Sequence, residues 1–95
     1  MARLYPVLRL ESRLLHLTRS LARDLAPAVR VNTILPGPVL FPDDYPEEAR
    51  QREVANTLLQ RGGHAEDIAR AAVFLLENKY LTGVALPVDG GRLLA

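Results

Sequence analysis

The 95-residue chain contains no cysteine and no tryptophan, and only 5% of its residues are aromatic. The absence of cysteine excludes disulfides, thiolate nucleophiles and cysteine ligands for zinc. The two histidines, His16 and His64, lie far apart in the sequence and cannot form a zinc site by themselves. We therefore expect no metal centre and a fold that is stabilised by packing alone.

The sequence also lacks an excess of charge of one sign and long apolar runs. Twelve basic residues against eleven acidic ones give a net charge of +1, which produces no field that would attract nucleic acid or an anionic membrane. No apolar run approaches the ~20 residues of a membrane span, and the N-terminal MARLYPVLRLESR lacks the apolar core of a secretory signal. We expect a cytoplasmic protein that binds neither nucleic acid nor membrane.

What the sequence does contain is a clear helical period followed by a strand pattern. Five leucines between Leu10 and Leu25 recur at spacings of three and four residues, which predicts one apolar stripe on a long helix. Pro27 ends this helix, because the residue before a proline is disfavoured in the helical region. The β-branched run from Val29 to Leu35 then predicts a buried strand.

The second half of the chain predicts two helices and a last strand. A polar helix with few apolar anchors, expected to be mobile, runs from Pro46 toward Leu59. A third helix begins near Glu66, and residues 84–88 form a short strand. Pro87 lies within that strand and cannot donate to a ladder, so the strand suits only a sheet edge. The order helix-strand-helix-helix-strand predicts an α/β fold, the C-terminal part of a doubly wound parallel sheet.

Two parallel strands do not make a stable sheet by themselves. Parallel strands normally lie inside larger sheets that are covered on both faces, and an apolar strand with an open edge exposes unpaired backbone groups. We therefore expect residues 1–95 to form a single partial domain. We also expect self-association, or a partner chain that completes the sheet.

Four motifs in order resemble the C-terminal portion of the short-chain dehydrogenase/reductase family. They are LTRSLARDLAP, VRVNTILPGPV, EDIARAAVFLLE and LTGVALPVDGG. With KYLTG and the bulky PGPVL turn, the chain most resembles the pteridine-reductase-like bacterial members. The resemblance implies a Rossmann-like fold and NAD(P)-dependent hydride transfer at carbonyl or alcohol groups. It also implies that Pro36, Gly37 and Val39 lie beside the nicotinamide, and that the polar helix from Pro46 to Leu59 is a mobile lid over the substrate.

The catalytic Tyr-x-x-x-Lys pair of that family is missing. Counting back from LTRSLA places the two roles at Val7 and Glu11. Valine has no proton to transfer, and an anionic glutamate would raise the pKa of a neighbouring tyrosine where the family lysine lowers it. Tyr5 and Arg9 have the same spacing, but their use requires a two-residue slip that rotates the pair by roughly 200° about the helix. The alternative is that Tyr5 packs as a hydrophobic staple and that Arg9 is a solvated charge.

The glycine-rich turn that cradles a dinucleotide diphosphate is absent as well, since none of the six glycines forms G-x-G-x-x-G after a strand. We do not expect this chain alone to hold NAD(P). Three hypotheses follow: part of a short-chain reductase that is inactive alone, a non-enzymatic module that pairs through the Leu10–Leu25 helix or the exposed strand edge, or a degenerate product without function.

Isolated polar residues have structural and catalytic interpretations. For Asn32 inside the apolar strand we favour hydrogen bonds to neighbouring loops over catalysis, and for Asp89 we favour a turn-forming role. We expect Thr18 to be a hydroxyl on the helix surface, His16 to be partly buried, and His64 to cap a helix or to be exposed to solvent.

Overall fold

The computed structural model describes the backbone of residues 4–95 and the side chains from Glu11 onward. The side chains of Tyr5, Val7 and Arg9 therefore lie outside the described residues. The observed elements are α1 (Leu4–Leu25), β1 (Thr33–Pro36), α2 (Glu47–Ala55), α3 (Ala65–Glu77), β2 (Ala85–Val88) and a short 3₁₀ helix, η1 (Arg92–Leu94). The predicted α/β class and order of elements are confirmed.

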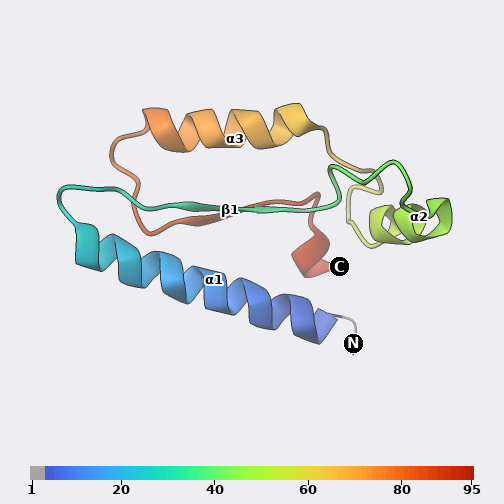
Figure 1. The fold of residues 1–95 in the computed structure, drawn as a ribbon, viewed down its shortest axis with the longest axis horizontal. Helices are drawn as coiled ribbons and strands as arrows, with labels where there is room; N and C mark the ends of the chain where they lie inside the picture. Colours follow the sequence, from blue (N-terminus) through green and yellow to red (C-terminus); the bar gives the residue numbers. More distant parts are fainter. Residues whose placement is uncertain (1–3) are drawn as a thin grey trace.

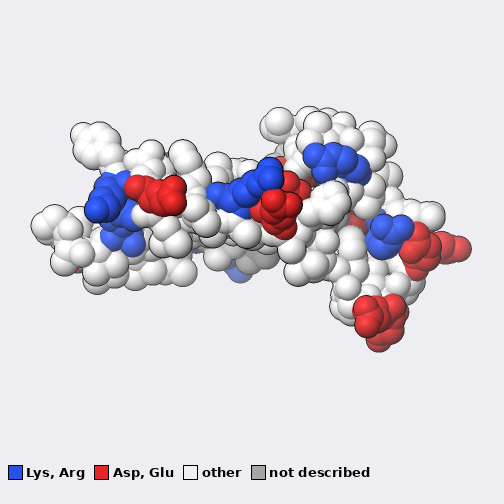
Figure 2. All heavy atoms as spheres, turned by 90° about the horizontal axis from the view of Figure 1, so that it is seen from above, with Lys and Arg blue, Asp and Glu red and all other residues white. Residues whose placement is uncertain are grey.

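The elements form three layers around a small sheet (Figure 1). β1 and β2 pair in parallel, with Thr33 opposite Ala85 and Pro36 opposite Val88. α1 lies on one face of this sheet and α3 on the other, while α2 lies beyond the C-terminal ends of the strands. The view onto α3 in Figure 2 shows basic and acidic side chains next to one another, without one large area of a single sign.

β1 is shorter than the predicted strand at residues 29–35, because side chains replace part of the ladder. The backbone N–H of Val31 donates to Thr82 Oγ1 at 3.1 Å, while its carbonyl accepts from Gly83 at 2.7 Å. The Asn32 amide donates to the Leu81 carbonyl at 3.1 Å and accepts from the Val84 N–H at 3.0 Å. The prediction that Asn32 joins neighbouring loops is confirmed.

Arg30 caps the C-terminus of α3, although it precedes the helix carbonyls that it contacts by 45 and 46 residues in the sequence. Its guanidinium donates to the carbonyl oxygens of Leu75, Leu76, Asn78 and Leu81 at 3.0–3.2 Å. The last carbonyls of a helix have no intrahelical partner. α3 has no basic residue in its own last turn, so Arg30 supplies the positive charge that its C-terminus favours.

The face of α1 that packs on the sheet differs from the leucine stripe. Thr18 and Ala22 are buried, whereas Leu17, Leu21 and Leu25 keep exposed fractions of 54%, 39% and 42%. The expectation that Thr18 is a surface hydroxyl was wrong, because this helix face turns toward β1. His16 was expected to be partly buried and is exposed instead.

The core is small for the length of the chain. Among the described residues, the buried apolar side chains are Ala22, Leu35 and Leu75, together with Pro38 in the turn after β1. The Cα radius of gyration is 14.9 Å, while a compact domain of this length would have about 12 Å. The two-stranded sheet therefore separates two helices without enclosing a large apolar interior.

Candidate functional site

The Pro-Gly turn after β1 brings the three predicted cofactor-binding residues together. Pro36, Gly37 and Val39 line one cavity of about 470 Å³ at the C-terminal end of β1. The remaining wall comes from the loop and from the first turns of α3, through Leu40, Ala65, Ile68 and Ala69. We call this the elbow cavity. Sequence reasoning missed these four wall residues.

Gly37 lets the Pro-Gly turn after β1, which we call the elbow, lie directly against the end of β2. A Cβ atom at this position would lie 2.6 Å from Asp89 Cα and 3.0 Å from the Asp89 carbonyl oxygen. The Gly37 N–H also donates to the Val88 carbonyl at 3.0 Å, which continues the parallel ladder. Only a residue without a side chain fits this approach, so Gly37 fixes the turn that shapes the cavity.

Asp89 forms the turn that follows β2, as predicted. Its Oδ1 accepts from the Gly91 N–H at 2.9 Å, and its Oδ2 accepts from the Leu93 N–H at 3.3 Å. These two contacts hold the Gly90–Gly91 turn and the start of η1 in place.

The segment after α2 is attached to that turn. α2 itself has no buried residue, in line with the few apolar anchors expected. Thr57, however, is only 1% exposed, and the Leu59 N–H donates to the Gly90 carbonyl at 3.0 Å. Glu53 of α2 pairs with Arg92 of η1. The C-terminal side of the predicted lid is thus joined to the end of the chain.

Glu11, which is predicted from the sequence to stand at the position of the family lysine, is partly buried. Burial, and secondly the charge of Asp89, raise the pKa of its carboxyl above the ordinary value. Its Oε2 is buried and has no hydrogen-bond partner among the described residues. A carboxylate in this setting cannot lower the pKa of a proton donor, which is the role of the family lysine.

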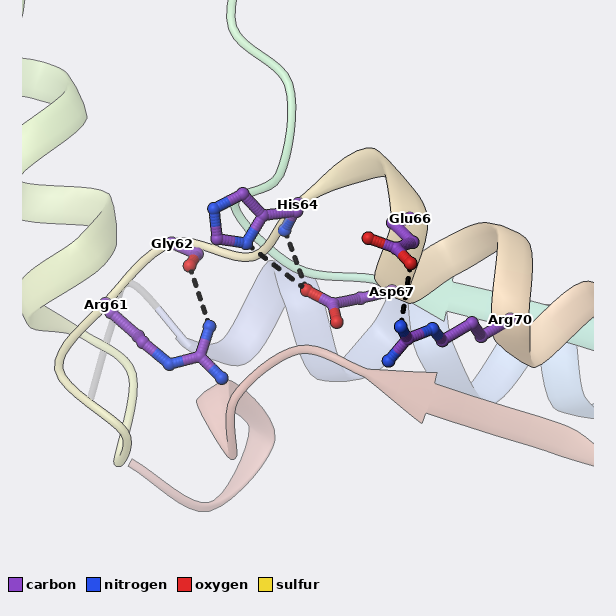
Figure 3. A network of polar contacts seen from close by, with 6 residues as sticks. All are labelled: Arg61, Gly62, His64, Glu66, Asp67 and Arg70. Carbon is purple, nitrogen blue, oxygen red and sulfur yellow. Dashed lines mark hydrogen bonds and ion pairs between the residues drawn. The ribbon is translucent and has the colours of Figure 1, made fainter.

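The N-terminus of α3 carries a charged network next to the elbow (Figure 3). The Asp67 carboxylate accepts from the His64 N–H at 2.8 Å, and Arg70 pairs with Glu66 at 2.7 Å. The His64 backbone contact, followed by the charges of His64, Arg61 and Arg70, lowers the pKa of Asp67. His64 occupies the N-cap position with an 81% exposed side chain, which agrees with both expectations for it.

The elbow cavity is lined by apolar residues and by the backbone of the turn near Val39. Such walls suit a flat ring. No glycine-rich turn follows a strand to receive a diphosphate.

Within residues 4–95 as described, no helix has the length and apolarity to cross a membrane. No group of three or more His, Asp or Glu side chains lies together there to hold a metal ion.

Comparison with known proteins identifies the family. A family model described as enoyl-(acyl carrier protein) reductase matches residues 11–92. The chain belongs to the short-chain dehydrogenase/reductase family. The resemblance inferred from the four motifs is confirmed, and the match begins at Glu11.

Bacterial pteridine and folate reductases are among the similar members of this family. Dihydromonapterin reductase of Escherichia coli O6:K15:H31 (strain 536) is 38% identical over 77 residues, and that of strain K12 is 36% identical. The crystal structure of FolM alternative dihydrofolate reductase 1 from Brucella canis, complexed with NADP, is 39% identical with a TM-score of 0.74. A small-chain dehydrogenase in complex with NADPH is 36% identical with a TM-score of 0.75.

The short-chain dehydrogenase/reductase chain described here is much shorter than these relatives. The alignment covers 81% of this chain and 32% of the E. coli enzyme. The superposition covers 88% of this chain and 32% of the Brucella canis enzyme, or 41% of the NADPH-bound dehydrogenase. The chain therefore spans about a third of the length of the curated relatives that it matches.

Proposed function

We propose that this chain supplies the C-terminal part of an NAD(P)-dependent short-chain reductase that acts on reduced pteridines. The observation that supports this is the elbow cavity, in which Pro36, Gly37 and Val39 come together. The named activities of the E. coli and Brucella relatives support the substrate class. NADPH or NADH, when bound, supplies the hydride for such a reduction. A cytoplasmic location belongs to the same proposal.

In this proposal the chain positions the cofactor and does not transfer the proton. The backbone near Val39 binds the nicotinamide carboxamide, and Gly37 keeps the elbow close to Asp89. Val7 and Glu11 replace the proton donor and its lysine, and loss of proton transfer costs about 10² to 10⁴ in rate. The chain alone is therefore inactive or weak.

A partner that completes the sheet is the second part of the proposal. Val31, Thr33 and Gly37 make their backbone contacts toward β2, so the alternate residues present their backbone groups to the open edge of β1. A cavity of about 350 Å³ lies between Ile34 of β1 and the α3 side chains Ala72, Leu75 and Leu76, and Arg30 and Asn32 are its polar walls. The open edge of β1 and these mostly apolar walls suit a further strand, provided by the remainder of a reductase.

The deciding experiment is an NADPH titration followed by nicotinamide fluorescence. We expect no saturable binding to the chain alone. Binding should appear when the chain is mixed with the part of the E. coli K12 dihydromonapterin reductase that it does not match. Micromolar binding to the chain alone would contradict the proposal that the upstream phosphate cradle is essential.

Two substitutions separate cofactor positioning from proton transfer. Val7→Tyr with Glu11→Lys should not create dihydropterin-dependent NADPH oxidation in the isolated chain, because the diphosphate still has no binding turn. In the mixed sample the same double variant should raise the rate above that of the unmodified chain. Equal rates in the mixed sample would argue against the assigned positions of the two roles.

A non-enzymatic module that pairs through α1 is the second candidate function. The exposed leucines Leu17, Leu21 and Leu25 favour it, since they leave an apolar stripe on the outer face of the helix. Light scattering after size exclusion should then show a dimer that Leu17→Gln with Leu21→Gln converts to a monomer. Leu94→Gln, which changes an exposed leucine outside α1, is the matched control. A folded monomer for the unmodified chain would reject this candidate.

A further inference from the structure

A second cavity of about 240 Å³ lies on the β2 side of the elbow. It shares Gly37 and Val39 with the elbow cavity, but its other walls come from different segments. Pro38, Leu59 and Val88 provide apolar surface, and Arg61, Asp67 and Arg70 provide charge. We call it the arginine cavity, and its binding properties are independent of the proposed reductase function.

Backbone hydrogen bonds build the arginine cavity without any ligand. The Leu59 N–H donates to the Gly90 carbonyl at 3.0 Å, and the Gly63 N–H donates to the Pro38 carbonyl at 3.0 Å. The wall formed by residues 59–63 is therefore held at one end by the turn after β2 and at the other by the elbow. The buried Thr57 hydroxyl adds a contact to the Val54 carbonyl at 2.8 Å. A cavity whose walls are fixed in this way loses little conformational entropy on binding.

The two guanidinium groups of the cavity keep most of their donors available. Each guanidinium has five N–H donors. Arg61 donates to the Gly62 carbonyl at 3.2 Å, and Arg70 donates to Glu66 at 2.7 Å. Figure 3 shows both groups on the same side of α3, flanking the Asp67 carboxylate and facing the C-terminal segment. Arg61 makes no ion pair with any side chain in the described part of the chain.

The acidic residues of the cavity are engaged by other contacts. One oxygen of the Asp67 carboxylate accepts from the His64 N–H. Asp89 uses both of its carboxylate oxygens for the amides of Gly91 and Leu93. The polar groups of the cavity that are left to bind a ligand are therefore mainly guanidinium N–H donors. Such donors bind planar carboxylates through paired hydrogen bonds.

We propose that the arginine cavity binds a small carboxylate with a flat apolar body. The carboxylate contacts Arg61 and Arg70, and the apolar body lies against Pro38, Leu59 and Val88.

An NMR titration of the full ¹⁵N-labelled chain tests this assignment, with benzoate as the probe. We expect saturable shifts at the amides of Gly37, Gly63 and Gly90. Benzamide, which has the same shape without the charge, and inorganic phosphate, which has charge without an apolar body, should each bind at least about tenfold more weakly. Equal binding of either compound would overturn the proposed ligand class.

Variants of the two arginines locate the anion. Arg61→Gln and Arg70→Gln should each weaken benzoate binding by about tenfold, while Arg61→Lys, which keeps the charge, should restore part of the loss. Arg13→Gln removes an exposed arginine from α1 and should leave the affinity unchanged. Backbone spectra without ligand verify that each variant is folded. Benzoate affinity that is unchanged in folded Arg61→Gln and Arg70→Gln would overturn the site.

Discussion

The hydroxyl oxygens of Thr18 on α1 and Thr33 on β1 lie 2.5 Å apart. The Thr18 hydroxyl donates its proton to the Leu14 carbonyl at 2.6 Å, so the Thr33 hydroxyl is the donor to Thr18. Thr18 is only 3% exposed, so this pair is a buried polar contact between the helix and the sheet. It shows that α1 packs on β1 through small residues, which lets the helix backbone lie close to the strand.

Thr18→Val should destabilise the chain by about 1–2 kcal/mol, because it leaves the Thr33 hydroxyl without its partner. Thr33→Val should have a similar cost. The double variant should lose less than the sum of the two, with a coupling energy of about 1 kcal/mol. Urea denaturation of the four proteins completes the cycle. Strict additivity would show that the two hydroxyls do not interact in solution.

Arg30→Gln should lower the free energy of unfolding by about 2 kcal/mol, because two carbonyl oxygens in the last turn of α3, that of its C-cap and that of Leu81 in the following loop lose a charged donor. Arg30→Lys should recover only part of this, since an ammonium cannot reproduce the fork of the guanidinium. Arg19→Gln, at an exposed position on α1, serves as the control. Hydrogen exchange should locate the loss in the last turn of α3, and unchanged protection there would contradict the capping role.

Gly37→Ala should cost about 1–3 kcal/mol, because the new methyl group would collide with the backbone of Asp89. Gly62→Ala is the matched comparison, since its nearest neighbour, the Pro38 carbonyl oxygen, lies 3.1 Å from the built Cβ. Chemical denaturation should rank Gly37→Ala as the more destabilising of the two. The reverse order would show that the elbow can move away from β2.

The stability of the chain should depend on the protonation of Glu11. The pKa of this carboxyl is raised above 4.5 in the folded chain, so the folded state binds the proton more tightly than the unfolded state. The stabilisation is therefore fully present below the unfolded pKa and is lost as the pH rises through the folded pKa.

Glu11→Gln, which imitates the protonated form, should stabilise the chain at about pH 7 and lose this advantage at about pH 4. The gain should not exceed about 1 kcal/mol, because solvent screens a partly exposed group. Urea midpoints of both proteins at the two pH values measure it, with the exposed loop variant Asp44→Asn as control. An advantage of the same size at both pH values would exclude Glu11 titration as its cause.

The arrangement of secondary structure could be predicted from short-range rules. Helical spacing defined α1, Pro27 ended it, and the four motifs identified the family. The interpretation that Val7 and Glu11 stand in place of the catalytic pair also comes from the sequence, as does the observation that none of the six glycines forms G-x-G-x-x-G. Asn32 and Asp89 were predictable because a polar side chain within a strand, or before two glycines, has few ways to satisfy its hydrogen bonds.

The tertiary structure decided which surfaces meet. Periodicity identified the leucines of α1, yet the buried face carries Thr18 and Ala22, because close packing on the sheet favours small side chains over large ones. The contacts of Arg30 with α3, and the position of Arg61 and Arg70 in the wall of one cavity, involve residues whose distance in the sequence carries no signal. Sequence alone predicted the elements, whereas the close approach of the two strand ends created the two cavities.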